Sequence, residues 1–328
     1  MIARGKVLAL CGGVGGAKLA LGLYRVLAPQ QLVLCVNTGD DFVHLGLHVS
    51  PDLDTVLYTL AALDNPETGW GRRGETWTFM QALAALGGET WFRLGDGDLA
   101  THVERTRRLA RGESLTAITD DFAQRLGIEA ELLPMSDDPV RTLVETSEGT
   151  MPFQRYFVAR RCEPAVGRIV FEGAERARPN ARVMAALKSP DLALVVICPS
   201  NPYLSVDPIL ALPALRQALE DRAAPALTVS PLIGGQAVKG PTAKIMAELD
   251  VPLTQASIAR HYDGLIDGIM IDRADHAEAA SLPLTTRSSR ILMTSLEDRE
   301  RLAREALEFG ASLDRRANSP RKEAPRGP

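Results

Sequence analysis

The chain alternates between short, continuous apolar runs and segments in which apolar residues recur at helical spacing. The first run covers residues 7–11 and precedes a helical pattern over residues 17–27, and a second run covers residues 31–36. Short apolar runs between helical segments are typical of strands buried on both faces of a parallel sheet. The pattern therefore predicts an α/β fold, with a Rossmann-like, mostly parallel sheet and helices on both faces.

The same alternation returns in the second half of the chain. Further strands are predicted at residues 192–197, 226–229, 268–271 and 291–293. A helical pattern covers residues 206–219, and Pro213 within it predicts a kink or a new start. A final amphipathic helix follows Ser295, a favoured N-cap residue. These segments are expected to complete the parallel sheet and its helical layers.

The period of the pattern changes between residues 129 and 173. Short β-prone runs, one of them at residues 156–158, are separated there by turn formers such as Ser147-Glu148-Gly149. We interpret this region as a small, largely antiparallel insertion. The predicted division is a nucleotide-binding core over residues 1–112 and 180–312, an α+β insertion over 113–179, and a disordered tail over 313–328.

Composition and charge narrow the classes of partner. The 328-residue chain is 45% hydrophobic and 24% charged, with a formal net charge of −4 at pH 7. A nucleic-acid or membrane-surface binder usually carries a basic excess, and no run approaches the ~18 apolar residues of a membrane span. The four cysteines show no C-x-x-C spacing, which favours buried free thiols over a disulfide or zinc site. We expect a cytoplasmic homodimer with small-molecule substrates and no nucleic-acid or membrane partner.

The turn after the first predicted strand holds four glycines within five positions: Gly12, Gly13, Gly15 and Gly16. Glycines let the backbone turn through angles that a Cβ forbids, and they let a ligand approach the main chain. The helix that follows aims its first N–H groups and its positive dipole end at the turn. A phosphate or diphosphate is therefore the expected occupant. The alternative is a tight turn without a ligand.

Two known phosphate-binding patterns do not fit this turn. The P-loop pattern G-x-x-x-x-G-K-[ST] requires Gly and Ser or Thr where the chain has Ala17 and Leu19. The dinucleotide pattern G-x-G-x-x-G begins at Gly13 but meets Lys18 in place of its third glycine. We therefore expect a nucleotide or diphosphate held in a variant geometry.

Carboxylates gather at three predicted loop sites. They are Asp40 and Asp41 after the second strand, Asp52 and Asp54 in the first turn of a helix, and Asp96 and Asp98 after a short strand or extended segment over 90–94. Mg²⁺ prefers one or two carboxylates together with phosphate oxygens, so a diphosphate with its cation would explain the group. Helix-start and turn roles are the structural alternatives. The coincidence of the three sites favours Asp40 and Asp54.

Later segments are less specific. Ser200 and Asn201 follow a buried strand and are suited to hold a base or a phosphate, with an ordinary N-cap as the alternative. Residues 234–242 again place glycines and Lys239 after a strand, with a plain glycine turn as the alternative. Surface or packing roles are expected for three histidines, His44, His48 and His102.

Six segments together resemble one enzyme family. They are Gly-Gly-Val-Gly-Gly-Ala-Lys (12–18), Asn-Thr-Gly-Asp-Asp (37–41), His-Val-Ser-Pro-Asp-Leu-Asp-Thr (48–55), Trp-Phe-Arg-Leu-Gly-Asp-Gly-Asp-Leu-Ala (91–100), Cys-Pro-Ser-Asn-Pro-Tyr-Leu-Ser-Val-Asp-Pro-Ile-Leu (198–210) and Pro-Leu-Ile-Gly-Gly-Gln-Ala-Val-Lys-Gly-Pro (231–241). In this order they resemble the 2-phospho-L-lactate transferase family, whose length would cover nearly all of the chain except the tail.

The resemblance implies a step in the biosynthesis of the deazaflavin coenzyme F-420. Members of the family transfer a phospholactyl group from a lactyl-diphospho-guanosine donor to the terminal ribityl hydroxyl of the deazaflavin Fo. GMP leaves, and Mg²⁺ is required. The acyl part of the donor stays open, because phospholactate, phosphoenolpyruvate and 3-phosphoglycerate derivatives are all used within the family.

The resemblance also implies roles for individual residues. Fo is expected at Asp54 and Arg93, and Asp54 is expected to orient and deprotonate the Fo hydroxyl. Asp40 is the second catalytic candidate, and Mg²⁺ is expected at Asp40 or Asp54. The nucleotide and its phosphates are assigned to Gly12, Gly13, Gly15, Gly16, Lys18, Asn37, Ser200 and Asn201.

Two other functions are compatible with the glycine turn. Regulatory proteins related to this family bind nucleotide-sugars without a known transfer reaction and share the glycine-rich start. A nicotinamide-dependent oxidoreductase would also carry a βα glycine turn, but the third glycine of its pattern is missing here. The segments around Asp54 and Arg93 favour the transferase.

Overall fold

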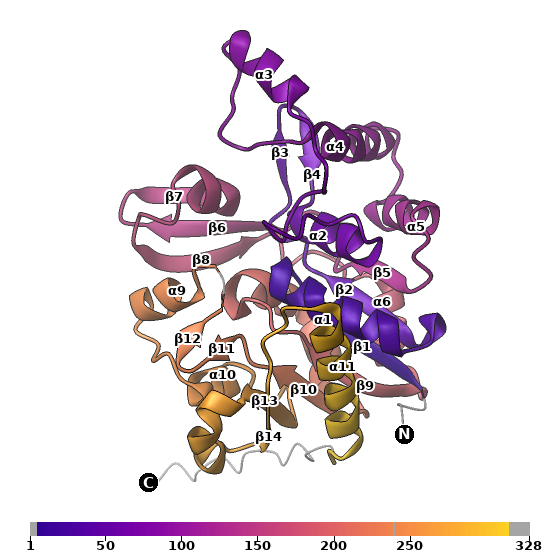
Figure 1. Cartoon of the computed structure of the whole chain (residues 1–328), viewed down its shortest axis with the longest axis vertical. Helices are drawn as coiled ribbons and strands as arrows, with labels where there is room; N and C mark the ends of the chain where they lie inside the picture. Colours follow the sequence, from indigo (N-terminus) through magenta and orange to yellow (C-terminus); the bar gives the residue numbers. More distant parts are fainter. Residues whose placement is uncertain (1–4, 239, 315–328) are drawn as a thin grey trace, which may run out of the picture.

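The computed structural model describes residues 5–238 and 240–314 (Figure 1). Its centre is a seven-stranded parallel sheet with the strand order β14-β13-β10-β9-β1-β2-β5. In chain order the strands are β1 (Lys6–Cys11), β2 (Leu32–Val36), β5 (Glu131–Pro134), β9 (Leu192–Ile197), β10 (Ala226–Val229), β13 (Gly268–Asp272) and β14 (Thr285–Ser289). The predicted α/β fold with a parallel sheet is confirmed.

The chain builds this sheet outward from β1 in two directions. β2 and β5 extend it on one side, and β9, β10, β13 and β14 follow in order on the other side. The direction of winding therefore reverses between β1 and β9. In open α/β sheets, ligands bind in the crevice at the carboxyl ends of the strands where this reversal occurs. The glycine turn after β1 and the Ser200–Asn201 segment after β9 both belong to this crevice.

Helices cover both faces of the sheet, as the pattern predicts. The apolar cluster on one face includes residues of α1 (Gly13–Val26), α2 (Pro51–Leu60), α5 (Leu115–Arg125) and α11 (Leu296–Ala311). The cluster on the other face includes residues of α6 (Ala181–Leu187), α7 (Asp207–Leu210), α8 (Pro213–Asp221), α9 (Thr242–Glu248) and α10 (Gln255–His261). The new helical start predicted at Pro213 is confirmed, because α7 ends at Leu210 and α8 begins at Pro213.

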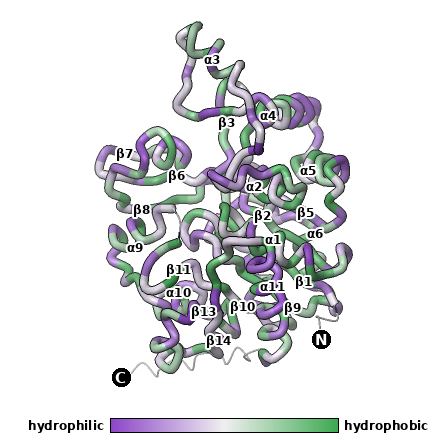
Figure 2. The backbone as a smooth tube through the Cα atoms, in the orientation of Figure 1, coloured by the Kyte–Doolittle hydropathy of each residue, from purple (hydrophilic) through white to green (hydrophobic). Residues whose placement is uncertain are grey.

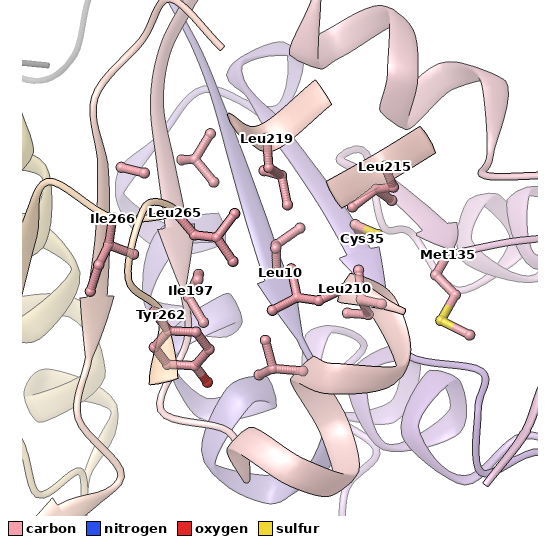
Figure 3. Close-up of a cluster of buried hydrophobic side chains, with 14 of the residues drawn as sticks. Leu10, Cys35, Met135, Ile197, Leu210, Leu215, Leu219, Tyr262, Leu265 and Ile266 are labelled. Carbon is pink, nitrogen blue, oxygen red and sulfur yellow. The ribbon is translucent and has the colours of Figure 1, made fainter. Parts of the chain in front are cut away.

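Side-chain alternation along the strands divides the core between these two faces. Leu10 and Ile197, from the neighbouring strands β1 and β9, pack with Leu215 and Leu219 of α8 (Figure 3). Ala9, next to Leu10 in β1, belongs to the opposite cluster. These strands are continuous apolar runs because helices cover both faces of the sheet and bury the side chains on each.

Beyond the carboxyl ends of the strands stand two smaller parts of the molecule (Figure 1). One is a lobe made of the hairpin β3 (Phe42–His44) and β4 (Leu47–Val49) with α3 (Thr78–Ala85) and α4 (Asp96–Leu109). In Figure 2, α4 is largely hydrophilic, which suits a helix outside the central layers. The other is an antiparallel sheet, β7-β6-β8, built from β6 (Arg141–Thr146), β7 (Gly149–Pro152) and β8 (Val166–Glu172).

Short elements complete the described chain. They are η1 (Pro29–Gln31), η2 (Arg155–Ala159), η3 (Pro202–Val206), η4 (Arg273–Ser281) and the hairpin of β11 (Leu232–Ile233) and β12 (Gln236–Ala237).

Four local predictions differ from the structure. The last strand is Thr285–Ser289 rather than residues 291–293, because a polar edge strand gives no apolar run. Residues 90–94 form no strand, and residues 156–158 lie in the helical turn η2. Glu131–Pro134, within the region that we interpreted as antiparallel, is an edge strand of the main sheet. The antiparallel sheet starts only at β6, and the domain boundaries stay a prediction.

The four cysteines are free thiols, as predicted, and three of them are buried. Cys11, Cys35 and Cys198 are buried free thiols, and Cys162 is a half-buried one. None of the helices within residues 5–238 and 240–314 combines the length and the apolar character that a membrane span requires. Of the predicted tail over 313–328 only residues 313 and 314 are described, and Lys239 also lies outside the described residues.

Candidate functional site

A cavity of about 730 Å³ opens at the carboxyl ends of the parallel strands. Its lining comes from the glycine turn, the first turns of α2, the start of α4, and the segment after β9. The antiparallel sheet region adds Phe153 and Gln154, and the far end of the chain adds Ile291 and Met293. The cavity therefore lies at the crevice where the topology predicts a ligand.

The glycines of the turn pack against other parts of the protein. A Cβ on Gly12 would collide with the Asp52 carboxylate, and one on Gly15 would collide with the Pro199 carbonyl oxygen. A Cβ on Gly16 would collide with Ser200 Oγ. The Ser200 hydroxyl links the loop after β9 to the glycine turn. It accepts a hydrogen bond from Gly12 N (3.2 Å) and donates one to Gly12 O (2.8 Å). Three of the four glycines are thus required by the close approach of neighbouring loops.

Asp52 occupies the place at the start of α1 where we expected a phosphate. Its Oδ1 accepts a hydrogen bond from Gly13 N at 2.7 Å, and Gly13 has a φ of +62°. The positive end of a helix dipole favours an anion here, and the protein supplies one itself. Val14 and Gly15, the next residues of the first turn, line the cavity. The phosphate-binding role of Gly12 and Gly13 stays a prediction. A phosphate bound there would lie beside the Asp52 carboxylate, which already accepts the hydrogen bond from Gly13 N.

Asp52 and Asp40 form a buried carboxylate pair around Asn37. The Asn37 Nδ2 group donates to Asp52 Oδ2 at 2.9 Å and lies 3.3 Å from Asp40 Oδ1. Burial raises the pKa of Asp52 to about 6, although the hydrogen bonds from Asn37 and Gly13 oppose the shift. Burial, followed by the charges of Asp52 and Asp41, raises the pKa of Asp40 well above its usual range. This pair of carboxylates is suited to hold a proton or a divalent cation.

Asp54, two residues after Asp52, belongs to a separate charge cluster. Both carboxylate oxygens of Asp54 accept hydrogen bonds from the guanidinium of Arg105 in α4. Arg105 is 2% exposed. His102 Nδ1 lies 3.6 Å from Asp54 Oδ2, and His102 Nε2 lies 3.3 Å from Asp98 Oδ2. Tyr58 OH donates to Asp98 Oδ1 at 2.6 Å.

The charge cluster brings together two carboxylates, one arginine and one histidine. Asp54, Asp98 and His102 offer ligand atoms within 4.8 Å of one another, which is close enough for a metal ion. The guanidinium of Arg105 already contacts Asp54 on both oxygens, and it would repel a cation at this place. The pair of Asp40 and Asp52 therefore fits a divalent cation better.

The remaining predicted carboxylates hold the lobe together. Asp41 Oδ2 accepts a hydrogen bond from Ser50 Oγ at 2.8 Å and lies 3.0 Å from His48 Nε2. Asp96 accepts hydrogen bonds from the backbone N–H groups of Thr78 and Phe79, both at 3.1 Å, and so caps α3. These contacts give both residues a structural role.

Arg93 stands at the cavity among aromatic side chains. Its guanidinium lies over the Trp77 ring, 4.1 Å from the ring centroid, and the residue is exposed. Five of the rings that line the cavity form what we call the aromatic wall: Trp70, Trp91, Phe92, Phe153 and Phe157. A cation beside flat apolar surfaces is suited to a planar ligand with polar edges.

Ser200, Asn201 and Lys18, which we predicted to bind the nucleotide and its phosphates, all line the cavity. Asn201 Oδ1 caps η3 by accepting hydrogen bonds from Tyr203 N (3.0 Å) and Leu204 N (3.2 Å). Its Nδ2 is buried and has no hydrogen-bond partner among the described residues, so it can donate to a ligand. Lys18 Nζ donates to Met293 O at 3.0 Å. The structure thus gives Asn201 both the capping role and a free donor.

The second glycine turn is closed to phosphate. The N–H groups of Gly234 and Gly235 donate to the two carboxylate oxygens of Asp275, at 2.9 and 3.1 Å. Asp275 is 6% exposed and also accepts a hydrogen bond from Gln255 Nε2 at 3.1 Å. The plain glycine turn is therefore the correct interpretation of Gly234 and Gly235.

Sequence reasoning named Asp54 and Asp98 among the candidate carboxylates, but it missed Tyr58, Arg105 and Gln154 and gave His102 no place in the site. Asp98 and His102 are four positions apart in α4, as Asp54 and Tyr58 are in α2, and this helical spacing was a usable signal. For His102, which we expected at the surface or in packing, the structure shows a buried place in the charge cluster. Arg105 and Gln154 join the site from distant parts of the chain, and no local pattern marks them.

Comparison with known proteins agrees with the resemblance. A family model described as 2-phospho-L-lactate transferase CofD matches residues 7–308. A protein of Streptomyces griseus named phosphoenolpyruvate transferase is 40% identical over 317 residues, which cover 94% of this chain and 99% of the relative. A protein of Mycobacterium tuberculosis with the same name is 38% identical over 314 residues, which cover 88% of this chain and 94% of the relative.

A solved structure supports the fold. A member of the UPF0052 family from Bacillus halodurans aligns with a TM-score of 0.60, over 94% of this chain and 100% of that chain. The two sequences are 15% identical, so the likeness concerns the fold alone.

Proposed function

The chain belongs to the 2-phospho-L-lactate transferase family, and from this premise we propose that it transfers a phosphoacyl group to the ribityl hydroxyl of the deazaflavin Fo. The donor is linked to guanosine through a diphosphate. The hydroxyl oxygen of Fo attacks the phosphorus that carries the acyl group, and its proton passes to the Asp54 carboxylate. The bond from this phosphorus to the bridging oxygen breaks, and that oxygen leaves with GMP.

One observation carries the proposal: the first turn of α2 presents two carboxylates to two different partners. Asp52 contacts the glycine turn at Gly13 N, while Asp54 contacts Arg105 of α4. The same short turn therefore joins a place suited to a diphosphate to a place lined by aromatic rings and Arg93. Phosphoryl transfer depends mainly on such positioning of donor and acceptor.

The donor's nucleotide is proposed to lie between the glycine turn and the segment after β9. Val14 and Gly15 line the cavity in the first turn of α1, and Ser200 and Asn201 line it from the other side. The unpartnered Nδ2 of Asn201 is a hydrogen-bond donor for a base or a phosphate oxygen. A buried donor without a partner costs stability unless a ligand or water satisfies it.

The acceptor is proposed to lie against the aromatic wall. A deazaflavin is a flat ring system with polar edges, and stacking on aromatic faces would bury its apolar surface. Arg93 would contact a polar edge of this ring system. Asp54 is proposed to accept the hydrogen bond of the ribityl hydroxyl with a lone pair that Arg105 leaves free.

The carboxylate pair of Asp40 and Asp52 is the proposed site for Mg²⁺. Both carboxylates are buried, and the hydrogen bonds that the described chain gives to them come from neutral donors. These donors are the amides of Asn37 and Gln154, the Ser205 hydroxyl, and the backbone N–H groups of Gly13 and Asp40. A diphosphate beside them would add further negative charge. When bound, Mg²⁺ would neutralise this charge and assist the departure of GMP. We accordingly favour Asp52 over Asp54 as the second ligand beside Asp40.

The names of the relatives favour an enolpyruvyl group in the donor. The relatives from Streptomyces griseus and Mycobacterium tuberculosis are both named phosphoenolpyruvate transferase. We propose that this chain likewise uses an enolpyruvyl donor in preference to a lactyl or glyceryl one.

Acceptor-dependent release of GMP tests the proposal. The purified protein is mixed with Mg²⁺ and an enolpyruvyl-diphospho-guanosine donor, with and without Fo, and GMP is measured by chromatography. We expect stoichiometric GMP release only when Fo is present. Tight binding of the donor without Fo-dependent GMP would instead favour a regulatory nucleotide-binding protein.

A further inference from the structure

The antiparallel sheet region reaches the carboxylate pair through one side chain, Gln154. This residue lies between β7 and η2, is 5% exposed, and donates from Nε2 to Asp40 Oδ2 at 3.1 Å. A second link runs from the backbone N–H of Thr142 in β6 to Gly39 O, at 2.6 Å. The loop that carries Asp40 is therefore held from the side of this sheet as well as from the core.

Apart from Gln154, the Asp40 carboxylate is held by its own backbone N–H and by one long contact from Asn37. Asn37 Nδ2 has two hydrogens but faces three acceptors, Asp52 Oδ2 at 2.9 Å, Leu204 O at 3.2 Å and Asp40 Oδ1 at 3.3 Å. The longest of these contacts is the one to Asp40. The Gln154 amide donates to Asp40 Oδ2 at 3.1 Å, so of the two side-chain donors it makes the shorter hydrogen bond to this carboxylate.

Gln154 also stands between two cavities. The main cavity of about 730 Å³ and a second cavity of about 380 Å³ share four lining residues, Asp40, Trp91, Phe153 and Gln154. The hydrogen bond between Asp40 and Gln154 therefore forms part of the partition that separates the site from the neighbouring space. A change at Gln154 would affect the orientation of Asp40 and the closure of the site together.

We propose that Gln154 is a positioning residue, through which the antiparallel sheet region fixes the Asp40 carboxylate for the transfer reaction. The inference rests on the proposed function of the site. It gives the region around β6, β7 and β8 a role in the reaction in addition to lining the cavity. Residues that hold a metal-binding or catalytic carboxylate usually affect activity about 10- to 100-fold when they are replaced.

Two substitutions separate the hydrogen bond from the packing. Gln154→Met keeps much of the side-chain volume, and so the partition, but removes the donor. Gln154→Glu keeps the shape and places a second carboxylate against Asp40 Oδ2, so it should be the more damaging change. Gln217→Ala is the matched control, because Gln217 Nε2 donates to Asp221 Oδ2 at 3.1 Å on the exposed surface of α8.

The test measures kcat, the KM for both substrates, and Mn²⁺ binding by electron paramagnetic resonance in the presence of GDP. For Gln154→Met we expect kcat to fall about 10- to 100-fold, Mn²⁺ affinity to fall by a similar factor, and the KM for the donor to stay within about twofold. Gln154→Glu should lose more, and Gln217→Ala should match the wild type. Thermal unfolding of each variant checks that the fold is kept.

The outcomes separate this inference from the proposed function. If the wild type releases no GMP in the presence of Fo, the proposed function is wrong, and Mn²⁺ binding still reports on Gln154. If the wild type is active and Gln154→Met retains both its kcat and its Mn²⁺ affinity, the positioning role is wrong. A Gln154→Met variant that loses thermal stability and shows a higher KM for both substrates, with kcat unchanged, would likewise contradict it.

Discussion

Asp52 and Asp54 are separated by one residue in the first turn of α2, yet their surroundings differ. Asp52 accepts hydrogen bonds from neutral donors, and burial raises its pKa to about 6. Asp54 is paired with the buried guanidinium of Arg105. Asp54 therefore faces a buried positive charge, whereas Asp52 lies in a neutral buried environment, which favours a bound proton or cation. The two residues are therefore suited to different tasks in one reaction.

Substitution of Asp54 tests the acceptor role. Asp54→Ala would leave Arg105 buried without its partner, which costs about 3–5 kcal/mol of stability. Asp54→Asn keeps the shape and part of the hydrogen bonding, so it is the better variant. A positioned base contributes ~10²–10⁴-fold, and we expect a kcat loss of that order with GDP affinity kept. Steady-state kinetics and calorimetric GDP binding measure the two quantities, and near-normal turnover of a folded variant would contradict the role of Asp54.

The pKa of Asp52 predicts a pH dependence of stability. A folded pKa of about 6 lies above the value of 3.8 expected when the residue is unfolded. The stabilising contribution is therefore fully present below about pH 4 and is lost as the pH rises through about 6, by at most about 3 kcal/mol. Urea unfolding of wild type and Asp52→Asn with a chelator present, between pH 4 and 7, measures the difference. An identical pH slope in the two proteins would refute the shift.

At the scale of elements, the strand–turn–helix unit β1–α1 joins the fold to the site. Its glycines allow the turn to pack directly against Asp52 and the Pro199–Ser200 segment. The apolar run and the glycines were visible in the sequence, and so the strand and the helix were predicted, although the helix begins at Gly13, within the predicted turn. The packing partners were not, because they lie 39 and 188 residues away in the chain.

Gly15→Ala tests this packing. Its Cβ would collide with the Pro199 carbonyl oxygen, which is backbone and cannot rotate away, so the loops after β1 and β9 must separate. We expect guanosine nucleotide affinity to fall at least about tenfold, equivalent to 1.4 kcal/mol. Gly167→Ala, on β8, is the matched control, because the nearest atom to its Cβ would be Glu145 O at 3.6 Å. Unchanged nucleotide affinity in Gly15→Ala would show that the turn is no part of the nucleotide site.

The elements that sequence reasoning missed share a physical cause. β14 is a polar edge strand, and β5 is separated from its partner β2 by the lobe and α5. Local periodicity reports burial, so it detects neither a solvated edge nor a pairing between distant segments. Arg105 and Gln154 were hidden for the same reason, since each meets its aspartate only in the folded chain.

At the scale of the whole molecule, the sheet order places the glycine turn and the segment after β9 at one crevice, and the lobe and the antiparallel sheet region add the other walls. The six segments of the sequence that resemble the family all contribute residues to the lining of this cavity. The sequence therefore allowed the fold class and the general place of the site to be predicted. The division of roles among the aspartates required the contacts of the folded protein.

Ligand-dependent thermal stability tests the nucleotide preference of the whole protein. A ligand at 100 times its Kd stabilises the folded state by about 2.7 kcal/mol, which is a shift of several degrees in Tm. We expect GDP with Mg²⁺ to raise Tm and NAD at the same concentration to leave it unchanged. A larger shift with NAD would favour the oxidoreductase alternative.

The most direct measurement of the central claim is the mass of the deazaflavin product. Purified protein is given Fo, Mg²⁺ and an equimolar mixture of enolpyruvyl, lactyl and glyceryl diphospho-guanosine donors, and the products are analysed by mass spectrometry. We predict a phosphodiester of Fo that carries the enolpyruvyl group, with one GMP released for each Fo consumed. Unmodified Fo after full occupancy by donor and Mg²⁺ would contradict the account.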